Sequence, residues 1–503
     1  MNSSPTKTES LTSRAWWLTF AKTVGFAFSM ALPLVVVRRM NPEQVGVYKQ
    51  IFLIVTTAMN LLPLGVHMSA YYFLPREGDR RPQTVLNIIL FLSGVGALGC
   101  AVLFFFPHIL TVIFYQPELL PYSHLIGLTI LLWITGTFLE SVPIANEEIR
   151  LATILIITTQ ATRAMMFVTA AALWGTVRSL IYAAILHGFV QTGVLLWYLG
   201  SRFPAFWYSF DWSMFRRQMS YAIPLGAAAV LFTLQTDLHN YFVSKSFPPT
   251  MFAIYSFGSL QLPLMGLIGE AVNAVLITKV SVLQQQSRNR EIILLLARAA
   301  RKLAVLYFPV YALLIVVGPD LIKFLFTSRY IDSWPVFAVN LTLLPLNILM
   351  LDPIFRAYSS ERIFFLRVRV GIVLMQVFIL LLWTRQLGLV GVISVVVVAA
   401  IVERTVMAIH LGRLLGISRN DILLVRDIGK LALASLIAAV MCAALRSALT
   451  GNSLYLILTA CGTVYSIVYL TSIHLMRIPT REEYALIRGT FARYLLPINS
   501  LPD

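Results

Sequence analysis

The sequence predicts an all-α polytopic membrane protein with about fourteen transmembrane helices, forming two pseudo-symmetric six-helix lobes around a central cavity plus two C-terminal helices. Three observations predict this fold: an apolar composition, long uninterrupted apolar runs and a weak internal repeat. Of the 503 residues, 58% are hydrophobic and 12% are charged, and the mean hydropathy is +0.80. Because soluble domains carry about 25% charged residues, we expect lipid to be the solvent of this chain.

Apolar runs of roughly 20 residues are long enough to cross the hydrocarbon core as helices. The runs are continuous rather than alternating, which disfavours a membrane β-barrel, and a helix satisfies its own backbone in lipid. Residues 1–13 are polar and Lys22 lies inside the first run, so we expect a retained helix rather than a cleaved signal. The predicted spans are 16–37, 48–73, 85–106, 122–145, 151–174, 179–200, 220–243, 250–277, 301–318, 335–355, 364–384, 388–411, 429–448 and 454–476.

The basic residues predict the orientation of the chain. The 39 Lys and Arg residues exceed the 22 Asp and Glu residues and give a formal net charge of +17. Most of the basic residues fall in loops on one side of the predicted membrane. The positive-inside rule then makes both termini cytoplasmic. The excess is concentrated in segments 279–302, 356–369 and 404–430. These segments are short loops rather than a compact basic domain, so they favour topology and attraction to anionic lipids over a nucleic-acid partner.

An internal repeat divides the chain. Its matches occur in the same order in both halves: Pro42–Tyr48 with Pro249–Tyr255, Pro107–Phe114 with Pro319–Phe326, and Glu140 with Asp352. Six helices per lobe is an even number, so both lobes enter from the same side, as in parallel-repeat transporters whose substrate path lies between the repeats. The predicted divisions are an N-lobe at 1–200, a C-lobe at 201–415, two further helices at 416–476 and a cytoplasmic tail at 477–503.

Polar side chains form stripes on the first two helices of each lobe, which predicts that these four helices line a wet cavity. Hydrogen-bonded packing between helices is the alternative for the uncharged members. An ionisable group in mid-membrane costs at least about 2.5–3.5 kcal/mol, so Arg163 and the charged stripe residues indicate either a path or a buried ion pair that locks the fold. The stripe residues of most interest are Lys22, Tyr48, Asn60, Asp237, Asn240, Tyr255 and Glu270.

These motifs resemble the polysaccharide-biosynthesis (O-antigen or Wzx-type) flippases of the multidrug/oligosaccharidyl-lipid/polysaccharide exporter superfamily. Segment Asn41–Tyr48, which contains Gly46, is similar to the first loop of this family. Asp237, which precedes Tyr255, is similar to the aspartate that the family carries on its seventh helix. Ala253 stands where a second Gly is expected. The resemblance implies fourteen helices, a cavity lined by helices 1, 2, 7 and 8, and alternating access in the bacterial cytoplasmic membrane. It also implies a polyprenyl-pyrophosphate-linked oligosaccharide as substrate.

A diphosphate head with several sugars cannot cross about 30 Å of hydrocarbon unaided, but a cationic wet cavity could hold it. Lys22 is the first phosphate candidate, followed by Lys49 and Arg163; Lys49 could instead be an interfacial anchor. Amide and aromatic side chains are the candidates for sugar contacts: Asn60, Asn240, Tyr48 and Tyr255.

Three alternatives stay open. A drug or cation antiporter of the same superfamily would use Asp237 or Glu270 as its ion site. The second alternative is a membrane glycosyltransferase or polymerase, which would need a sizeable outer domain, whereas the outer segments of this chain are short. The third alternative is a scaffold for polysaccharide assembly proteins. The sequence contains no nucleotide-binding loop, nucleophile arrangement or metal-spaced cluster, and three cysteines lie inside predicted spans as expected for small buried hydrophobes. We therefore expect no cofactor and no covalent catalysis.

Overall fold

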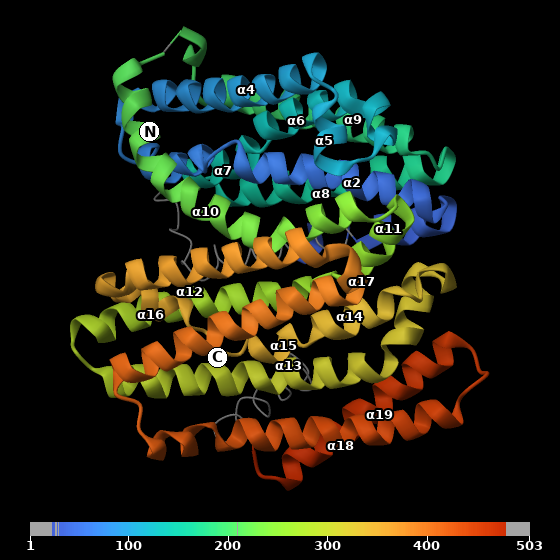
Figure 1. Cartoon of the computed structure of the whole chain (residues 1–503). Coiled ribbons are helices and arrows are strands. Elements are labelled where there is room, and N and C mark those ends of the chain that lie inside the picture. The colour runs from blue at the N-terminus through green and yellow to red at the C-terminus, as the bar shows by residue number, and fades with distance from the viewer. Residues whose placement is uncertain (1–22, 26–27, 29, 209, 479–503) are drawn as a thin grey trace, which may run out of the picture. The chain divides into compact units, whose positions relative to one another are not determined.

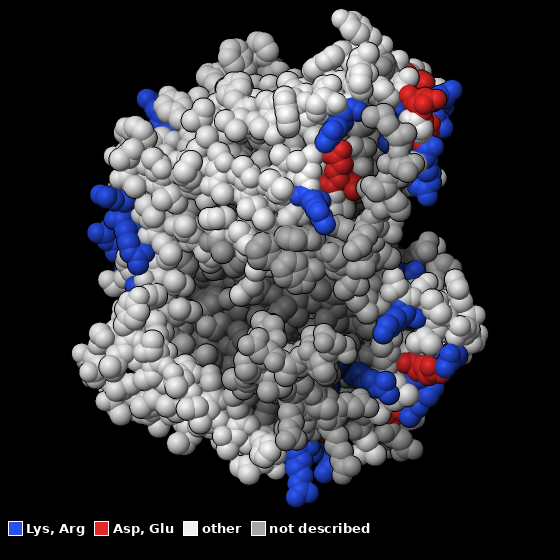
Figure 2. Space-filling model, turned by 180° about the vertical axis from the view of Figure 1, so that it is seen from behind, with Lys and Arg blue, Asp and Glu red and all other residues white. Residues whose placement is uncertain are grey.

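A computed structural model describes residues 23–25, 28, 30–208 and 210–478, and all regular elements in these ranges are helices (Figure 1). Ten of the described helices are long and apolar enough to cross a membrane, by length and composition. On the face that Figure 2 shows, charged side chains occupy a few patches among the described residues, separated by broad areas without charge. The protein is therefore an all-helical polytopic membrane protein.

The chain divides into two compact units. Unit 1 comprises Met1–Ser259, Leu325–Ser333 and Gln376–Ile393, and unit 2 comprises Leu260–Phe324, Trp334–Met375 and Ser394–Asp503. From residue 42 to residue 258 the α-helices are α2 (Pro42–Leu61), α3 (Ala70–Phe73), α4 (Arg81–Phe105), α5 (Ile109–Phe114), α6 (Ser123–Gly136), α7 (Phe138–Ala145), α8 (Ile149–Leu173), α9 (Val177–Arg202), α10 (Trp212–Ser246) and α11 (Pro249–Gly258). They are followed by α12 (Pro263–Gln285), α13 (Asn289–Phe326), α14 (Ser333–Leu341), α15 (Leu343–Leu346), α16 (Asp352–Ala357), α17 (Arg362–Leu415), α18 (Arg426–Ala448) and α19 (Leu454–Leu475).

The difference between ten candidate spans and about fourteen predicted ones has local causes. The first predicted span lies partly outside the described residues, and α10 is helical but falls outside the set of ten. The tenth predicted span is broken into α14, α15 and α16. The eleventh and twelfth are joined in α17, which has non-helical backbone at Gly388 (φ 64°, ψ −174°). A straight 54-residue helix would be about 81 Å long, so this break separates two helical segments.

Within unit 1, α2 and α11 pack closely against each other. Asn41 caps α2 through a reciprocal pair with Gln44, and Pro42 occupies the first turn, a favourable arrangement for a helix start. An added Cβ at Gly46 would overlap the carbonyl group of Pro249, at the start of α11. The two segments matched in the sequence repeat are thus packed directly together, and glycine at position 46 permits their approach.

Within unit 2, three ion pairs join α18 and the turn that precedes it to α13. Arg290 pairs with Asp421, Arg301 with Asp427 at 3.4 Å, and Asp320 with Arg446 at 2.6 Å. Leu303 and Ala304 of α13 share an apolar cluster with residues of α18 and α19. Two free cysteines, Cys442 and Cys461, are fully buried between α18 and α19.

Replacing Gly46 with Ala should destabilise the protein by about 1–3 kcal/mol, the usual cost of overpacking, because the new methyl group displaces the Pro249 backbone. Thermal unfolding of the purified protein in detergent measures this effect. Gly94→Ala in α4 is the matched control, since no atom lies within 4 Å of its added Cβ, and alanine is the better helix former. Equal stability of the two variants would contradict the close approach.

Replacing Arg446 with Leu should leave the Asp320 carboxylate, which is 7% exposed, without its partner. Breaking a buried pair costs about 3–5 kcal/mol, and we expect the lower end because Arg446 is 35% exposed. Denaturant titration in mixed micelles gives the free energy of unfolding. The control is Arg288→Leu, whose exposed partner is Glu291 and whose loss should cost less than about 1 kcal/mol. A cost for Arg446→Leu no larger than this control would refute the anchoring role.

Candidate functional site

The candidate site lies where helices α2, α6, α8 and α9 of unit 1 pack together. Arg163, in the second half of α8, places its guanidinium 4.6 Å from the ring centroid of Trp133 on α6. Trp133 is 3% exposed and donates its indole N–H to the Ala184 carbonyl of α9 at 2.9 Å. This hydrogen bond fixes the ring plane, so a rigid aromatic face is presented to the cation.

Other aromatic rings extend this face. Phe52 of α2 lies 5.8 Å from Trp133 and 5.5 Å from Phe167, measured between ring centroids. Tyr48, one turn earlier on α2, lies 4.8 Å from Phe52. The spacing of four residues puts Tyr48 and Phe52 on one helical face. Together the rings form an aromatic cluster against which Arg163 is held.

The charge of Arg163 is balanced at a distance. Glu140 is an electrostatic neighbour of Arg163, but within the described residues no carboxylate lies within salt-bridge distance of the guanidinium. A cation over an indole face is stabilised by about 0.5–2 kcal/mol, which is less than a buried ion pair offers in Coulomb energy. Arg163 therefore keeps donor capacity for an anionic ligand.

Lys49 lies beside this cluster but turns toward α11. Its Nζ is 4.8 Å from the ring centroid of Phe257. Phe257 in turn stacks on Phe326 at 4.4 Å and meets Tyr330 at 5.0 Å. Lys49 thus packs on an aromatic surface in this conformation. Lys22, the first phosphate candidate, lies outside the described residues.

Helices α10 and α11 carry three further predicted site residues. Tyr255 is fully buried, and its hydroxyl is 2.7 Å from Nδ1 of His239. A sugar could reach Tyr255 only if these helices moved. Asp237 and Asn240 are half-buried on α10. Within the part of the chain that the structure describes, no cation pairs with Asp237.

The structure therefore brings some of the predicted residues together. Tyr48 and Arg163 share the aromatic cluster, whereas Asn60 is exposed near the end of α2 and Glu270 is exposed on α12 in unit 2. Sequence reasoning missed Trp133 and Phe167, because an aromatic residue in an apolar span looks like ordinary core. The one available signal was a lone mid-span arginine that needed a partner. The described residues hold no group of three or more His, Cys, Asp or Glu that could bind a metal.

Comparison with known proteins gives a family match and a structural match. The model of a family described as "Polysaccharide biosynthesis protein" matches residues 35–335, and no curated protein matches the chain. The fold resembles a solved structure of the lipid II flippase MurJ in an inward closed conformation, with a TM-score of 0.69 at 15% identity, covering 92% of this chain and 98% of MurJ.

Multidrug transporters have the same fold. An inward-facing MATE family transporter of the MOP superfamily matches with a TM-score of 0.60 at 13% identity, covering 78% of this chain and 96% of the transporter. The MATE multidrug transporter DinF-BH matches with a TM-score of 0.56 at 16% identity, covering 82% of this chain and 98% of the transporter. The described fold is therefore similar to that of MurJ and of MATE transporters of the MOP superfamily.

Replacing Tyr255 with Phe should lower stability by about 1–3 kcal/mol, since it removes the hydroxyl partner of a His239 ring that is 8% exposed and leaves a buried polar atom unsatisfied. Thermal unfolding measures the change. Tyr182→Phe on α9 is the control, because Tyr182 is 53% exposed and a surface substitution usually changes stability by less than about 0.5 kcal/mol. If Tyr255→Phe changes the unfolding temperature no more than this control does, the buried hydrogen bond does not stabilise the fold.

Proposed function

The chain belongs to the polysaccharide biosynthesis protein family, and from this premise we propose that it is a flippase for a polyprenyl-pyrophosphate-linked oligosaccharide. The family match covers residues 35–335, and the fold is shared along nearly the whole chain with a lipid II flippase. The proposed cargo is a repeat unit of an O-antigen or exopolysaccharide. In this proposal the chain works by alternating access in the bacterial cytoplasmic membrane, with fourteen spans, two six-helix lobes and both termini inside.

The observation that carries the proposal is the arginine on an aromatic face. Arg163 has no carboxylate within salt-bridge distance among the described residues, and it lies 4.6 Å from the Trp133 centroid. Guanidinium groups bind phosphate oxygens in bidentate geometry. Aromatic rings offer a large, rigid apolar surface with a polar handle in the case of Tyr48, which suits the flat faces of sugars. Both parts of the proposed cargo thus find a chemical complement in one cluster.

The proposal gives each of the other predicted site residues a role in binding the cargo or in coupling to an ion. Lys49 and Lys22 are secondary phosphate ligands that act when the helices rearrange, because Lys49 rests on Phe257 in this conformation. Asn60 and Asn240 supply amide contacts to sugar hydroxyls. Glu270 and Asp237 are carboxylates for an ion that couples to transport, which is also the role an antiporter would give them. No covalent step is involved.

Replacing Arg163 with Gln should reduce transport by at least about tenfold, because one charge-assisted contact to phosphate is worth roughly 1.5–3 kcal/mol. The measurement is translocation of a fluorescent polyprenyl-pyrophosphate-linked oligosaccharide in proteoliposomes. Arg163→Lys should keep part of the activity, since it preserves the charge but loses the planar fork. Arg178→Gln, at an exposed position of α9, is the matched control and should transport normally.

Two outcomes would sink the proposal. Full transport by Arg163→Gln would remove this residue from the path. Transport of organic cations by the wild-type protein, with no movement of the lipid-linked oligosaccharide, would identify an antiporter instead. Substitution of Asp237 with Asn should then abolish cation transport.

A further inference from the structure

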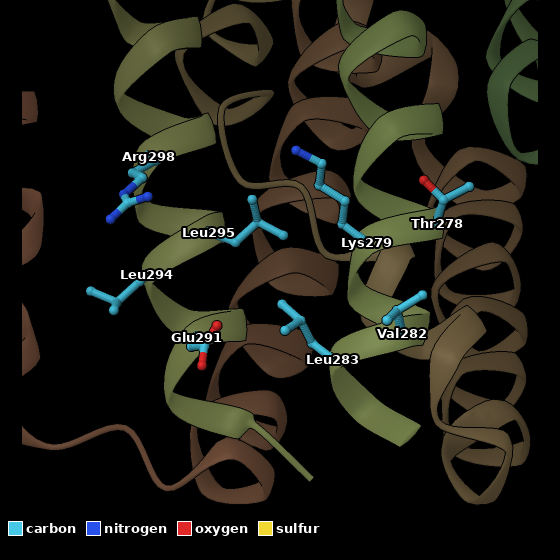
Figure 3. A pocket seen from close by; sticks show the side chains of 8 residues that line it. All are labelled: Thr278, Lys279, Val282, Leu283, Glu291, Leu294, Leu295 and Arg298. Atoms are coloured by element: carbon cyan, nitrogen blue, oxygen red, sulfur yellow. The ribbon is translucent and has the colours of Figure 1, made fainter. Parts of the chain in front are cut away.

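A pocket lies between α12 and α13, entirely within unit 2 (Figure 3). Its volume is about 480 Å³, in the range of about 300–1,000 Å³ that small-molecule sites occupy. Residues at 291, 294, 295 and 298 share one face of α13 by their spacing. The lining consists of Thr278, Lys279, Val282, Leu283, Glu291, Leu294, Leu295 and Arg298.

The charged side chains that line the pocket differ in whether they already have a partner. Glu291 is bonded to Arg288 outside the pocket, so its negative charge is already compensated. In contrast, no ion pair or hydrogen bond satisfies Lys279 or Arg298 within the described part of the chain. Figure 3 shows both basic side chains toward one end of the lining, on neighbouring helices, with Glu291 toward the other end. The basic end is therefore a site of uncompensated positive charge.

The length of α13 places this charge at the depth of lipid headgroups. Its 38 residues span about 57 Å, whereas the hydrocarbon core is only about 30 Å thick. The apolar part of the helix is its second half, and Arg290, Arg298, Arg301 and Lys302 fall in its first 14 residues. The first half then extends from the edge of the hydrocarbon core through the headgroup region and beyond it, and the pocket is on that half.

The rest of the lining is apolar and only partly covered. Val282 is 53% exposed, and Leu283, Leu294 and Leu295 are half-buried. Val280 of α12 and Ile292 of α13 are fully buried in one apolar cluster, which helps to hold the two helices together. A soluble anion would leave these apolar side chains uncovered. A molecule with a phosphate at one end and a hydrocarbon chain at the other would cover both parts.

We propose that this pocket binds an anionic phospholipid of the surrounding bilayer, with its phosphate held by Lys279 and Arg298 and an acyl chain lying along Leu283, Leu294 and Leu295. Basic pockets between membrane helices on the cytoplasmic side are suited to acidic headgroups, and the positive-inside prediction puts this one there. The site does not depend on which substrate the protein transports. It would tie the activity or stability of the protein to the acidic lipid content of the membrane.

Native mass spectrometry of the delipidated full chain, titrated with phosphatidylglycerol, tests the proposal. We expect Lys279→Gln/Arg298→Gln to weaken phosphatidylglycerol binding by about 30-fold, the effect of two cations near a membrane surface. Lys302→Gln/Lys323→Gln removes two charges from exposed positions of α13 outside the pocket and should bind as the wild type does. Phosphatidylcholine should bind weakly to all three proteins.

Two further variants separate the parts of the ligand. The variant Leu294→Gln/Leu295→Gln should bind phosphatidylglycerol more weakly than the wild type does. It should bind inorganic phosphate as the wild type does. Lys279→Arg/Arg298→Lys keeps both charges and should retain the lipid, which controls for loss of structure. Unchanged lipid binding in Lys279→Gln/Arg298→Gln, or an equal loss in the Lys302 and Lys323 control, would overturn the proposal. So would binding of lipid-linked oligosaccharide with no binding of phosphatidylglycerol, which would make the pocket a substrate site.

Discussion

A charged side chain in hydrocarbon must find a partner, since leaving it bare at the bilayer centre costs at least about 2.5–3.5 kcal/mol. The described helices meet this constraint in two ways. Arg446 joins Asp320, and Arg369 joins Glu403 at 3.4 Å, so that charges cancel locally. Arg163 instead lies over the indole of Trp133. The first solution locks helices together, and the second holds a cation in place without consuming its hydrogen-bond donors.

That second solution requires a rigid scaffold. Trp133 is fixed by the hydrogen bond to Ala184 and by rings from α2 and α8, so helix packing determines where Arg163 can lie. Packing of α2 is determined in turn by Gly46, whose missing side chain admits the Pro249 backbone. Ala253 occupies the matching place on α11 and is fully buried, so the two halves of the repeat differ in this detail. A movement of α11 would therefore displace α2, the helix that carries Gly46, and with it the side chains of Tyr48 and Phe52.

Much of the fold was predictable because the length of an apolar run is a local property. The long runs of α4, α8 and α9 are examples. The breaks were not predictable, since the backbone at Gly388 and the split of the tenth predicted span depend on contacts between helices. The same limit applies to the site. A charge inside an apolar span identified Arg163 as unusual, but its contact with Trp133 rather than with a carboxylate is a tertiary contact that no sequence pattern specifies.

The basic side chains discussed above differ most in the contacts that already stabilise their charge. Arg163 and Lys49 rest on aromatic rings, as expected where water is scarce and a bare charge is strongly unfavourable. Lys279 and Arg298 are exposed and lack such partners in the described structure, which is tolerable only where water or headgroups solvate them. A ligand at Arg163 must displace or share a ring contact, so binding there can be transient, as transport requires. A ligand at Lys279 and Arg298 displaces only water, so binding there is favoured whenever an acidic lipid is present.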